Sequence, residues 1–307
     1  MKLTVIVPCY NEQEALPFFQ REIDAVSKEL SELEIEILYI NDGSKDQTLS
    51  VIKELAERDK RVKYISFSRN FGKEAAMYAG LQHVTGELAV IMDADLQDPP
   101  SLLPEMYRAV VEEGCDSVAT RRVTRKGEPV IRSWFARRFY RLMNRISKTD
   151  IVDGARDYRL MNRSYIDALL AMGEYNRFSK GMFGWVGFET KWLEYKNVER
   201  AAGETKWSFW KLFRYACEGI MAFSTAPLMA VSLMGVFVCI FAFLFLIFVI
   251  VRAAVFGDPV AGWPSLVCII SFLSGIQLLG MGVVGMYLSK TYLETKHRPI
   301  YIEKESH

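Results

Sequence analysis

Two long stretches without a charged residue lie in the C-terminal third of the chain. No Asp, Glu, Lys or Arg occurs in residues 219–251 or in residues 259–289. Each stretch exceeds the ~20 apolar residues with which a helix crosses the hydrocarbon core of a bilayer. The alternative, two buried helices of a soluble protein, is disfavoured because both runs are too long and too apolar. We therefore predict a transmembrane hairpin with helices over 225–252 and 262–289.

The charges that flank this hairpin indicate its orientation. The loop between the two spans is short, so both ends of the hairpin lie on one side of the membrane. Lys and Arg residues occur in the flank 206–214 and in the tail 290–307, and such residues favour the cytoplasmic side. We therefore predict a multi-pass protein of the cell membrane, with its N-terminal domain and both termini in the cytoplasm.

The first 206 residues alternate between two hydrophobic patterns. Short apolar runs, typical of buried parallel strands, occur at Leu3–Pro8, Ile35–Ile40, Val62–Phe67 and Leu88–Asp93. Helical patterns lie between these runs, from Leu16 to Leu30, after Asp46, and from Lys73 to Val84. This alternation predicts an α/β domain with a doubly wound, mostly parallel sheet. Ligands of such sheets bind at the carboxyl ends of the strands, which are polar here.

A pair of carboxylates follows the fourth apolar run, in the sequence Asp93-Ala94-Asp95-Leu96-Gln97. If the strand continues through this run, alternate residues point the same way, and Asp93, Asp95 and Gln97 direct oxygens at one point. Hard divalent cations prefer oxygen ligands. The spacing therefore predicts a metal site beside a diphosphate. Asp98, which precedes two prolines, is interpreted as the N-cap of the next helix.

Composition and missing motifs argue against several other classes of protein. The net charge of +1 does not fit a general polyanion-binding protein. No GxGxxG follows the first strand and no GxxxxGK[ST] occurs, so dinucleotide oxidoreductases and P-loop proteins lose their main support. The five cysteines form no CxxC pair and no zinc-binding spacing, which indicates reduced packing residues.

Two segments combine basic and large apolar residues. Residues 131–148 interleave arginines with aromatic and aliphatic side chains, and residues 207–224 have a similar pattern. Basic amphipathic helices of this kind commonly lie on anionic membrane surfaces. Because two membrane spans are nearby, membrane lipids are favoured over nucleic acid as the partner. These helices would hold the site at the level of the lipid headgroups.

Four segments together resemble glycosyltransferase family 2, whose catalytic domain has the GT-A fold. They are Val-Pro-Cys-Tyr-Asn-Glu (7–12), Asn-Asp-Gly-Ser-Lys-Asp-Gln-Thr (41–48), Arg-Asn-Phe-Gly-Lys-Glu (69–74) and Asp-Ala-Asp-Leu-Gln-Asp-Pro (93–99). Asp-Tyr-Arg-Leu-Met (157–161) and Ala-Gly-Glu-Thr-Lys-Trp (202–207) are similar to the polyprenyl-phosphate glycosyltransferases, the group of dolichyl-phosphate mannose synthase. C-terminal segments at 256–260, 275–280 and 298–301 resemble the bacterial GtrB-type bactoprenol glucosyltransferases.

The resemblance implies a role for each matching position. Residues expected to hold the nucleotide sugar are Pro8, Tyr10, Glu12, Asp42, Lys73, Asp93 and Ala94. Those expected to hold Mg²⁺ or Mn²⁺ on the diphosphate are Asp93, Asp95 and Gln97. The acceptor phosphate would lie among Arg121, Arg132, Arg200 and Lys206. The expected catalytic residues are Asp95, Asp157, Arg121, Arg132 and Lys206.

The implied reaction moves a hexose, with inversion, from a UDP-sugar to undecaprenyl phosphate at the cytoplasmic face of the membrane. Glucose is the expected sugar, and N-acetylglucosamine or another hexose is the alternative. A phosphomonoester has its second pKa near ~6, so the nucleophile is ionised at neutral pH and needs little help from a base. Arginines that bridge two anions are therefore expected to contribute more than Asp157. Asp157 either acts as a base or positions an arginine or the sugar.

Further partners follow from the same resemblance, and two rival functions are weighed against it. A homo-oligomer, plausibly a tetramer, is expected, together with a downstream flippase and an outward-facing glycosyltransferase. A processive polysaccharide synthase is disfavoured because no Gln-x-x-Arg precedes Trp185 and only two spans occur. A non-catalytic membrane scaffold is disfavoured because both Asp93 and Asp95 are present.

Overall fold

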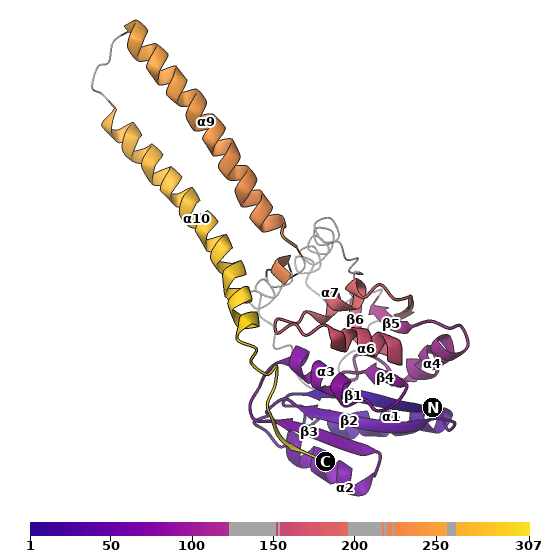
Figure 1. The fold of residues 1–307 in the computed structure, drawn as a ribbon. Helices are drawn as coiled ribbons and strands as arrows, with labels where there is room; N and C mark the ends of the chain where they lie inside the picture. The colour runs from indigo at the N-terminus through magenta and orange to yellow at the C-terminus, as the bar shows by residue number, and fades with distance from the viewer. Residues whose placement is uncertain (123–151, 153, 196–216, 218–219, 223, 257–261) are drawn as a thin grey trace. The chain divides into compact units, whose positions relative to one another are not determined.

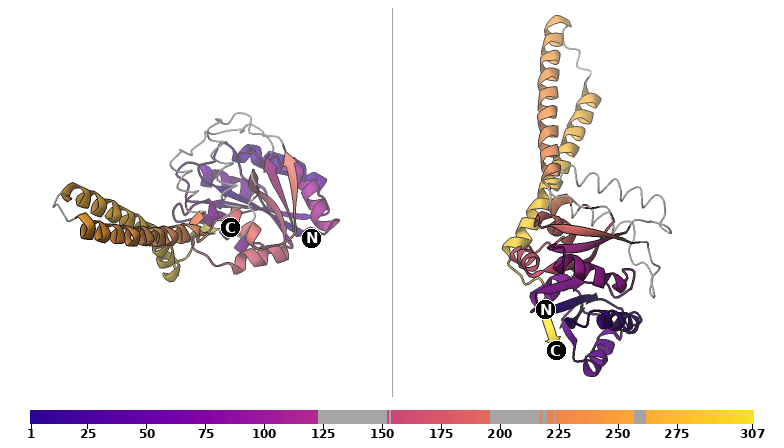
Figure 2. Two further views of the ribbon diagram at one scale, coloured as in Figure 1. Left: turned by 90° about the horizontal axis from the view of Figure 1, so that it is seen from above. Right: turned by 90° about the vertical axis from the view of Figure 1, so that its right-hand side faces the viewer.

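A computed structural model describes residues 1–122, 152, 154–195, 217, 220–222, 224–256 and 262–307. The chain divides into two compact units, one of Met1–Gly219 with Arg298–His307 and one of Ile220–His297. Figures 1 and 2 show the first as a sheet covered by helices and the second as a pair of long helices.

The first unit is built on one mixed sheet of eight strands in the order β7-β5-β6-β4-β1-β2-β3-β8. The strands are β1 Lys2–Cys9, β2 Glu34–Asn41, β3 Val62–Phe67, β4 Leu88–Ile91, β5 Ser117–Arg122, β6 Ala155–Asn162, β7 Thr190–Tyr195 and β8 Glu303–Ser306. Parallel pairs join β1 to β2 and β4, β2 to β3, and β5 to β7. β6 runs antiparallel to β4 and β5, and β8 runs antiparallel to β3. The carboxyl ends of β1–β4 therefore meet at one edge of the sheet.

Helices cover the sheet because their apolar residues recur on one side. They are α1 Leu16–Glu29, α2 Thr48–Arg58, α3 Lys73–Gln82, η1 Pro100–Leu102, α4 Leu103–Val111, α6 Arg163–Ala171 and α7 Ser179–Trp185. In α1, Leu16, Phe19 and Ile23 are fully buried and join the main core with Val5 and Val90 of the central strands. Strands buried on both faces explain the continuous apolar runs in the sequence.

The expected α/β class is confirmed, and the first three strands and helices lie where the patterns predict them. The fourth strand is shorter than expected, since β4 ends at Ile91 rather than at Asp93. The strands β5, β6 and β7 were not predicted. They carry several charged residues, so their apolar runs are weak signals.

The last ten residues return to the first unit rather than forming only a tail. β8 covers the edge strand β3, and Lys53 Nζ lies 2.7 Å from Glu305 Oε2. Tyr301 stacks on Phe67 at a centroid distance of 4.8 Å, and its hydroxyl donates to Gln82 Oε1 at 3.0 Å. A covered edge removes a row of unpaired backbone groups.

The second unit consists of α9 Ala226–Phe256 and α10 Trp263–Thr295. Both are long and apolar enough to cross a membrane, with candidate spans Ala226–Phe245 and Phe272–Thr295 of mean hydropathy 2.7 and 1.5. Described side chains such as Phe241, Leu244, Leu278 and Met281 are exposed. A Cβ at Gly280 would lie 3.2 Å from Val231 Cγ1, so this glycine allows the two helices to approach closely.

Candidate active site

The loops that follow β2 and β3 touch each other at the carboxyl edge of the sheet. Gly43 has φ +61°, and a Cβ there would lie 2.3 Å from the carbonyl carbon of Arg69. Only glycine fits both the left-handed conformation and the contact. The Asn41–Gly43 and Arg69–Asn70 segments, which sequence motifs singled out separately, therefore form one wall.

Asp42 organises this wall. Its carboxylate is 3% exposed and accepts hydrogen bonds from Phe71 N at 2.6 Å, Gly72 N at 2.9 Å and Asn70 Nδ2 at 2.8 Å. Burial raises the pKa of Asp42 to about 6, and the two backbone amides oppose that rise. The side chain expected to contact the nucleotide thus also fixes the turn that leads into α3.

Lys73, the first residue of α3, connects two strands of the sheet. Its Nζ lies 2.6 Å from Asp93 Oδ1, after β4, and 2.6 Å from Asp157 Oδ2, on β6. Desolvation of the charged groups is outweighed by their mutual attraction, which raises the pKa of Lys73 and holds the pKa of Asp157 well below its usual range. Lys180 also contributes to the low pKa of Asp157. Asp93 and Asp157, far apart in sequence, therefore share one cation.

The expected extension of the strand through the carboxylate pair is wrong. After Ile91 the chain turns, and Leu96 adopts φ +57°, so Asp93, Asp95 and Gln97 are not alternate residues of a strand. The turn is closed by Gln97 N, which donates to Asp95 Oδ1 at 3.2 Å. The three side chains remain within five consecutive residues, but the turn rather than a strand determines where they point.

The interpretation of Asp98 as a helix N-cap is also wrong. Pro99 occupies the cap of η1, with no side-chain hydrogen bond. The Asp98 side chain is 1% exposed and accepts a hydrogen bond from Arg156 Nε at 2.9 Å and another from the Tyr195 hydroxyl. A buried carboxylate needs such partners more than a helix end does. Asp98 thereby joins the Asp93–Gln97 turn to the residue that precedes Asp157.

The remaining expected residues divide into three groups. Pro8, Tyr10, Glu12 and Ala94 lie at the carboxyl ends of β1 and β4, near the wall described above. Arg121 lies at the end of β5, where its guanidinium pairs with Glu194 of β7. Arg132, Arg200 and Lys206, with the amphipathic segment 131–148, lie outside the described residues, as do residues 207–216 of the second amphipathic segment.

Sequence reasoning missed a buried link between α3 and α7. Glu74 accepts hydrogen bonds from Ser179 N at 3.0 Å and from the Ser179 hydroxyl. Burial raises the pKa of Glu74 to about 7, against the lowering effect of the Ser179 hydrogen bonds. The only signal was its position beside Lys73 in the Arg69–Glu74 motif.

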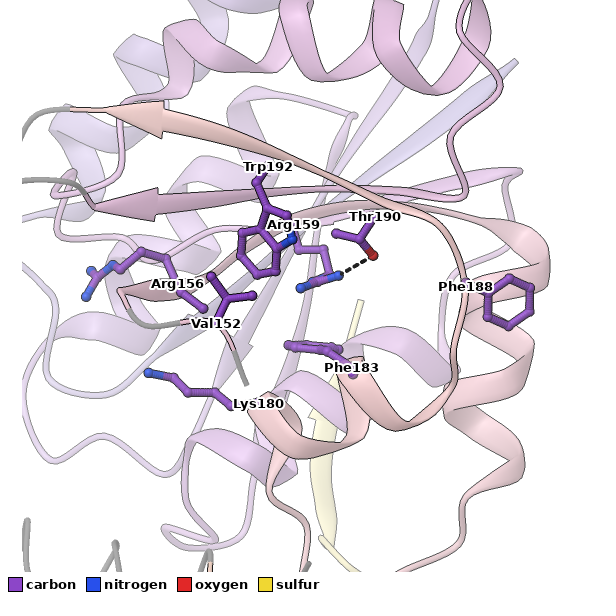
Figure 3. A pocket seen from close by; sticks show the side chains of 10 residues that line it. Val152, Arg156, Arg159, Lys180, Phe183, Phe188, Thr190 and Trp192 are labelled. Atoms are coloured by element: carbon purple, nitrogen blue, oxygen red, sulfur yellow. Dashed lines mark hydrogen bonds between the residues drawn. The ribbon is translucent and has the colours of Figure 1, made fainter. Parts of the chain in front are cut away.

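A second missed feature is a cavity of about 240 Å³ on the β5–β6–β7 side of the sheet. Figure 3 shows Arg159 between Phe183 and Trp192, with Lys180 and Arg156 nearby. Thr190 and Phe188 also line the cavity. Ala155, Arg156 and Arg159 of β6 all line the cavity, and the pairing of β6 with β5 shifts register within this stretch. Asp157 pairs with Lys73, and its charge also acts on Arg159 at this cavity.

Comparison with known proteins identifies the family. The model of glycosyl transferase family 2 matches residues 4–170. This chain belongs to glycosyl transferase family 2. It is 43% identical over 307 residues to an SfII prophage-derived bactoprenol glucosyl transferase of Shigella flexneri, covering 100% of this chain and 99% of that protein. It is 42% identical to the putative glycosyltransferase CsbB of Bacillus subtilis over 99% of this chain and 92% of that one.

A solved structure supports the GT-A-like fold of this family 2 chain. Mannosyl-3-phosphoglycerate synthase from Rubrobacter xylanophilus superposes with a TM-score of 0.50 at 18% identity, covering 72% of each chain. The family 2 chain is therefore a glycosyltransferase whose candidate active site lies at the carboxyl edge of β1–β4, beside β6.

Proposed function

We propose that this glycosyltransferase moves glucose, with inversion, from UDP-glucose to a polyprenyl phosphate, with undecaprenyl phosphate as the natural acceptor. The observation that carries the proposal is the 43% identity, over the full chain, to bactoprenol glucosyl transferase. Two helices long and apolar enough to cross a membrane fit an acceptor that resides in the bilayer. Transfer of N-acetylglucosamine to the same lipid remains the alternative.

The donor nucleotide is proposed to bind at the wall formed by the β1, β2 and β3 loops. Tyr10 and Glu12 follow β1, and Asp42 follows β2. The backbone amides of Phe71 and Gly72 donate hydrogen bonds to Asp42, which hold the 70–72 turn. α3 therefore begins at the candidate site, where Lys73 pairs with Asp93. Lys73 is proposed to bind the diphosphate of the donor.

Asp93, Asp95 and Gln97 are proposed to hold Mg²⁺ or Mn²⁺. Among the described residues there is no group of three or more His, Cys, Asp or Glu arranged for a metal. Two carboxylates and one amide nevertheless fit Mg²⁺ well, because such sites commonly use one or two carboxylates and complete the coordination with substrate phosphates. The bound ion would stabilise negative charge on the departing diphosphate.

Asp157 is proposed to position Lys73 rather than to remove a proton. Lys73 and Lys180 hold the pKa of Asp157 below its usual range, which makes this carboxylate a weak proton acceptor at neutral pH. The acceptor phosphate is ionised at that pH and supplies its own nucleophilic oxygen. Repulsion between the anionic donor and the anionic acceptor is then the main barrier, and the cations around Asp157 lower it.

The membrane setting extends the same proposal. The hairpin would anchor the catalytic unit at the cytoplasmic face of the cell membrane, with both termini in the cytoplasm. Arg132, Arg200 and Lys206, the homo-oligomer, the flippase and the outward-facing glycosyltransferase remain predictions.

The proposal is tested with purified full-length protein, UDP-[¹⁴C]glucose, undecaprenyl phosphate and Mn²⁺. Label is expected to pass into the chloroform phase only when the lipid phosphate is present. Label from UDP-N-acetylglucosamine alone would favour the alternative sugar. If UDP-glucose, UDP-N-acetylglucosamine, UDP-galactose and GDP-mannose all leave the lipid unlabelled, the proposed acceptor is wrong.

A further inference from the structure

Arg159 is a buried cation whose hydrogen bonds, within the described part of the chain, go to hydroxyl groups. The residue is 3% exposed, and its Nη1 donates to Ser117 Oγ at 3.1 Å, Tyr165 OH at 3.0 Å and Thr190 Oγ1 at 3.3 Å. Its Nε has no hydrogen-bond partner. The guanidinium carbon lies 4.6 Å from the centre of the Phe183 ring and 5.4 Å from that of Trp192.

A buried charge without a counter-charge is costly, and natural proteins pair such groups or use them. Among the described residues no carboxylate forms an ion pair with Arg159. Asp157 of β6, whose charge acts on Arg159, forms its ion pair with Lys73. Burial lowers the pKa of Arg159, and the charges of Tyr165 and Asp157 oppose that lowering only in part. The site therefore favours an incoming anion.

The cavity beside Arg159 adds a second cation and an apolar wall. Lys180 of α7 lines it, and Arg156 lies at its border, where Asp98 already neutralises the charge. Phe183, Phe188 and Trp192 provide aromatic surface. A volume of about 240 Å³ is smaller than the ~300–1,000 Å³ of pockets that enclose whole ligands. The cavity therefore suits the charged head of a longer, apolar molecule.

We propose that this cavity is a phosphomonoester subsite, in which Lys180 binds the phosphate of the lipid acceptor, Arg159 adds positive charge to the cavity, and the aromatic rings contact the first isoprene unit of the acceptor. The proposal rests on the proposed function and adds residues to it. The donor diphosphate is the less suitable ligand because Asp42, Lys73 and Asp93 gather on the β1–β4 side, whereas the cavity lies among β5, β6, β7 and α7. Asp157 of β6 connects the two, through its ion pair with Lys73 and the action of its charge on Arg159.

The subsite is tested by comparing Lys180→Ala with Lys191→Ala in the full-length protein. Thr190 and Trp192 of β7 line the cavity, whereas Lys191 points to the other face of that strand and pairs with Glu113. Lys180→Ala is expected to raise the KM for undecaprenyl phosphate about 10-fold or more, as loss of a charge-assisted hydrogen bond does, and to change the KM for UDP-glucose less than about twofold. Lys191→Ala is expected to change neither value.

A binding measurement on the same full-length variants separates the subsite from catalysis. Geranyl phosphate is expected to raise the Tm of the wild-type protein and of Lys191→Ala, but not that of Lys180→Ala, and geraniol is expected to have no effect. Equal acceptor KM values in the two variants, with turnover intact, would overturn the subsite and leave the proposed function standing.

Two further outcomes distinguish the remaining possibilities. Lys180-dependent binding of geranyl phosphate by a protein that labels no lipid would support the subsite and overturn the proposed function. A parallel rise in the UDP-glucose KM of Lys180→Ala, with Lys180-dependent stabilisation by UDP, would assign the cavity to the donor diphosphate and overturn the acceptor assignment.

Discussion

Asp42 and Arg159 are buried charged side chains on opposite sides of the sheet, and they differ in how their charge is satisfied. Asp42 and Arg159 are both 3% exposed. Asp42 accepts hydrogen bonds from two backbone amides and one side-chain amide of a single turn. Arg159 donates to hydroxyl groups, is stacked by aromatic rings and retains an unpartnered Nε. The first charge holds a turn of the candidate site, whereas the second belongs to the proposed subsite.

Asp95→Ala is the largest expected effect, because it removes a carboxylate from the turn between the two sides. Turnover is expected to fall by roughly 1,000-fold, the scale on which loss of one charge-stabilising group affects catalysis. Initial rates in the lipid-labelling assay measure it. Asp167→Ala, which removes an exposed carboxylate of α6, is the control and should retain wild-type rates. Substantial turnover by Asp95→Ala would show that this turn does not support the chemistry.

Glu74→Gln tests the buried link between the two sides by its pH dependence. The folded-state pKa of Glu74 is raised to about 7 by burial, so the stability that the protonated group provides is complete below its ordinary pKa and lost as the pH rises through 7. Glutamine stays neutral. The stability of Glu74→Gln relative to wild type is therefore expected to increase between pH 5 and 8, on the order of 2–3 kcal/mol.

Thermal unfolding of the full-length protein across this pH range measures the difference. Glu54→Gln, at a 62% exposed side chain of α2, is the control and should show no such trend. A constant difference between Glu74→Gln and wild type would mean that Glu74 is not held protonated at neutral pH.

Asp42→Ala tests whether the first buried charge is structural. The substitution leaves the amides of Phe71 and Gly72 without their acceptor, which is expected to cost about 1–3 kcal/mol of stability. Hydrogen exchange of these two amides should accelerate, while exchange at Thr190 and Trp192 should not change. Unchanged protection at 71 and 72 would contradict the account of the turn.

Tyr301→Ala is expected to have the smallest effect and probes how the C-terminal segment supports the β1–β4 side of the sheet. Tyr301 stacks on Phe67, whose ring contacts Phe71 at a centroid distance of 5.8 Å, so the C-terminal segment supports the turn that Asp42 holds. Loss of the ring and its hydrogen bond is expected to cost about 1–2 kcal/mol. Ile302→Ala, at a 52% exposed neighbour, is the control for the Tm measurement. Identical Tm values for the two variants would show that the C-terminal segment does not support the turn that Asp42 holds.

The difference between the two sides also explains what could be predicted from sequence. On the β1–β4 side the strands have strong apolar runs, so β1, β2 and β3 and the polar residues at their ends were predictable from pattern alone. The turn at Leu96 was not, because its left-handed conformation has no glycine to signal it. The two prolines after Asp98 indicate a helix N-cap, whereas the actual partner of Asp98 is Arg156, 58 residues away in the sequence. Arg159 and Lys180 meet only through the pairing of β5, β6 and β7.

The most direct test of this account is a pair of KM values measured in two variants of the full-length protein. Asp42→Ala is expected to raise the KM for UDP-glucose and to leave that for undecaprenyl phosphate near its wild-type value, and Lys180→Ala is expected to do the reverse. If both variants raise the same KM, the two sides of the sheet do not serve separate substrates, and the account is contradicted.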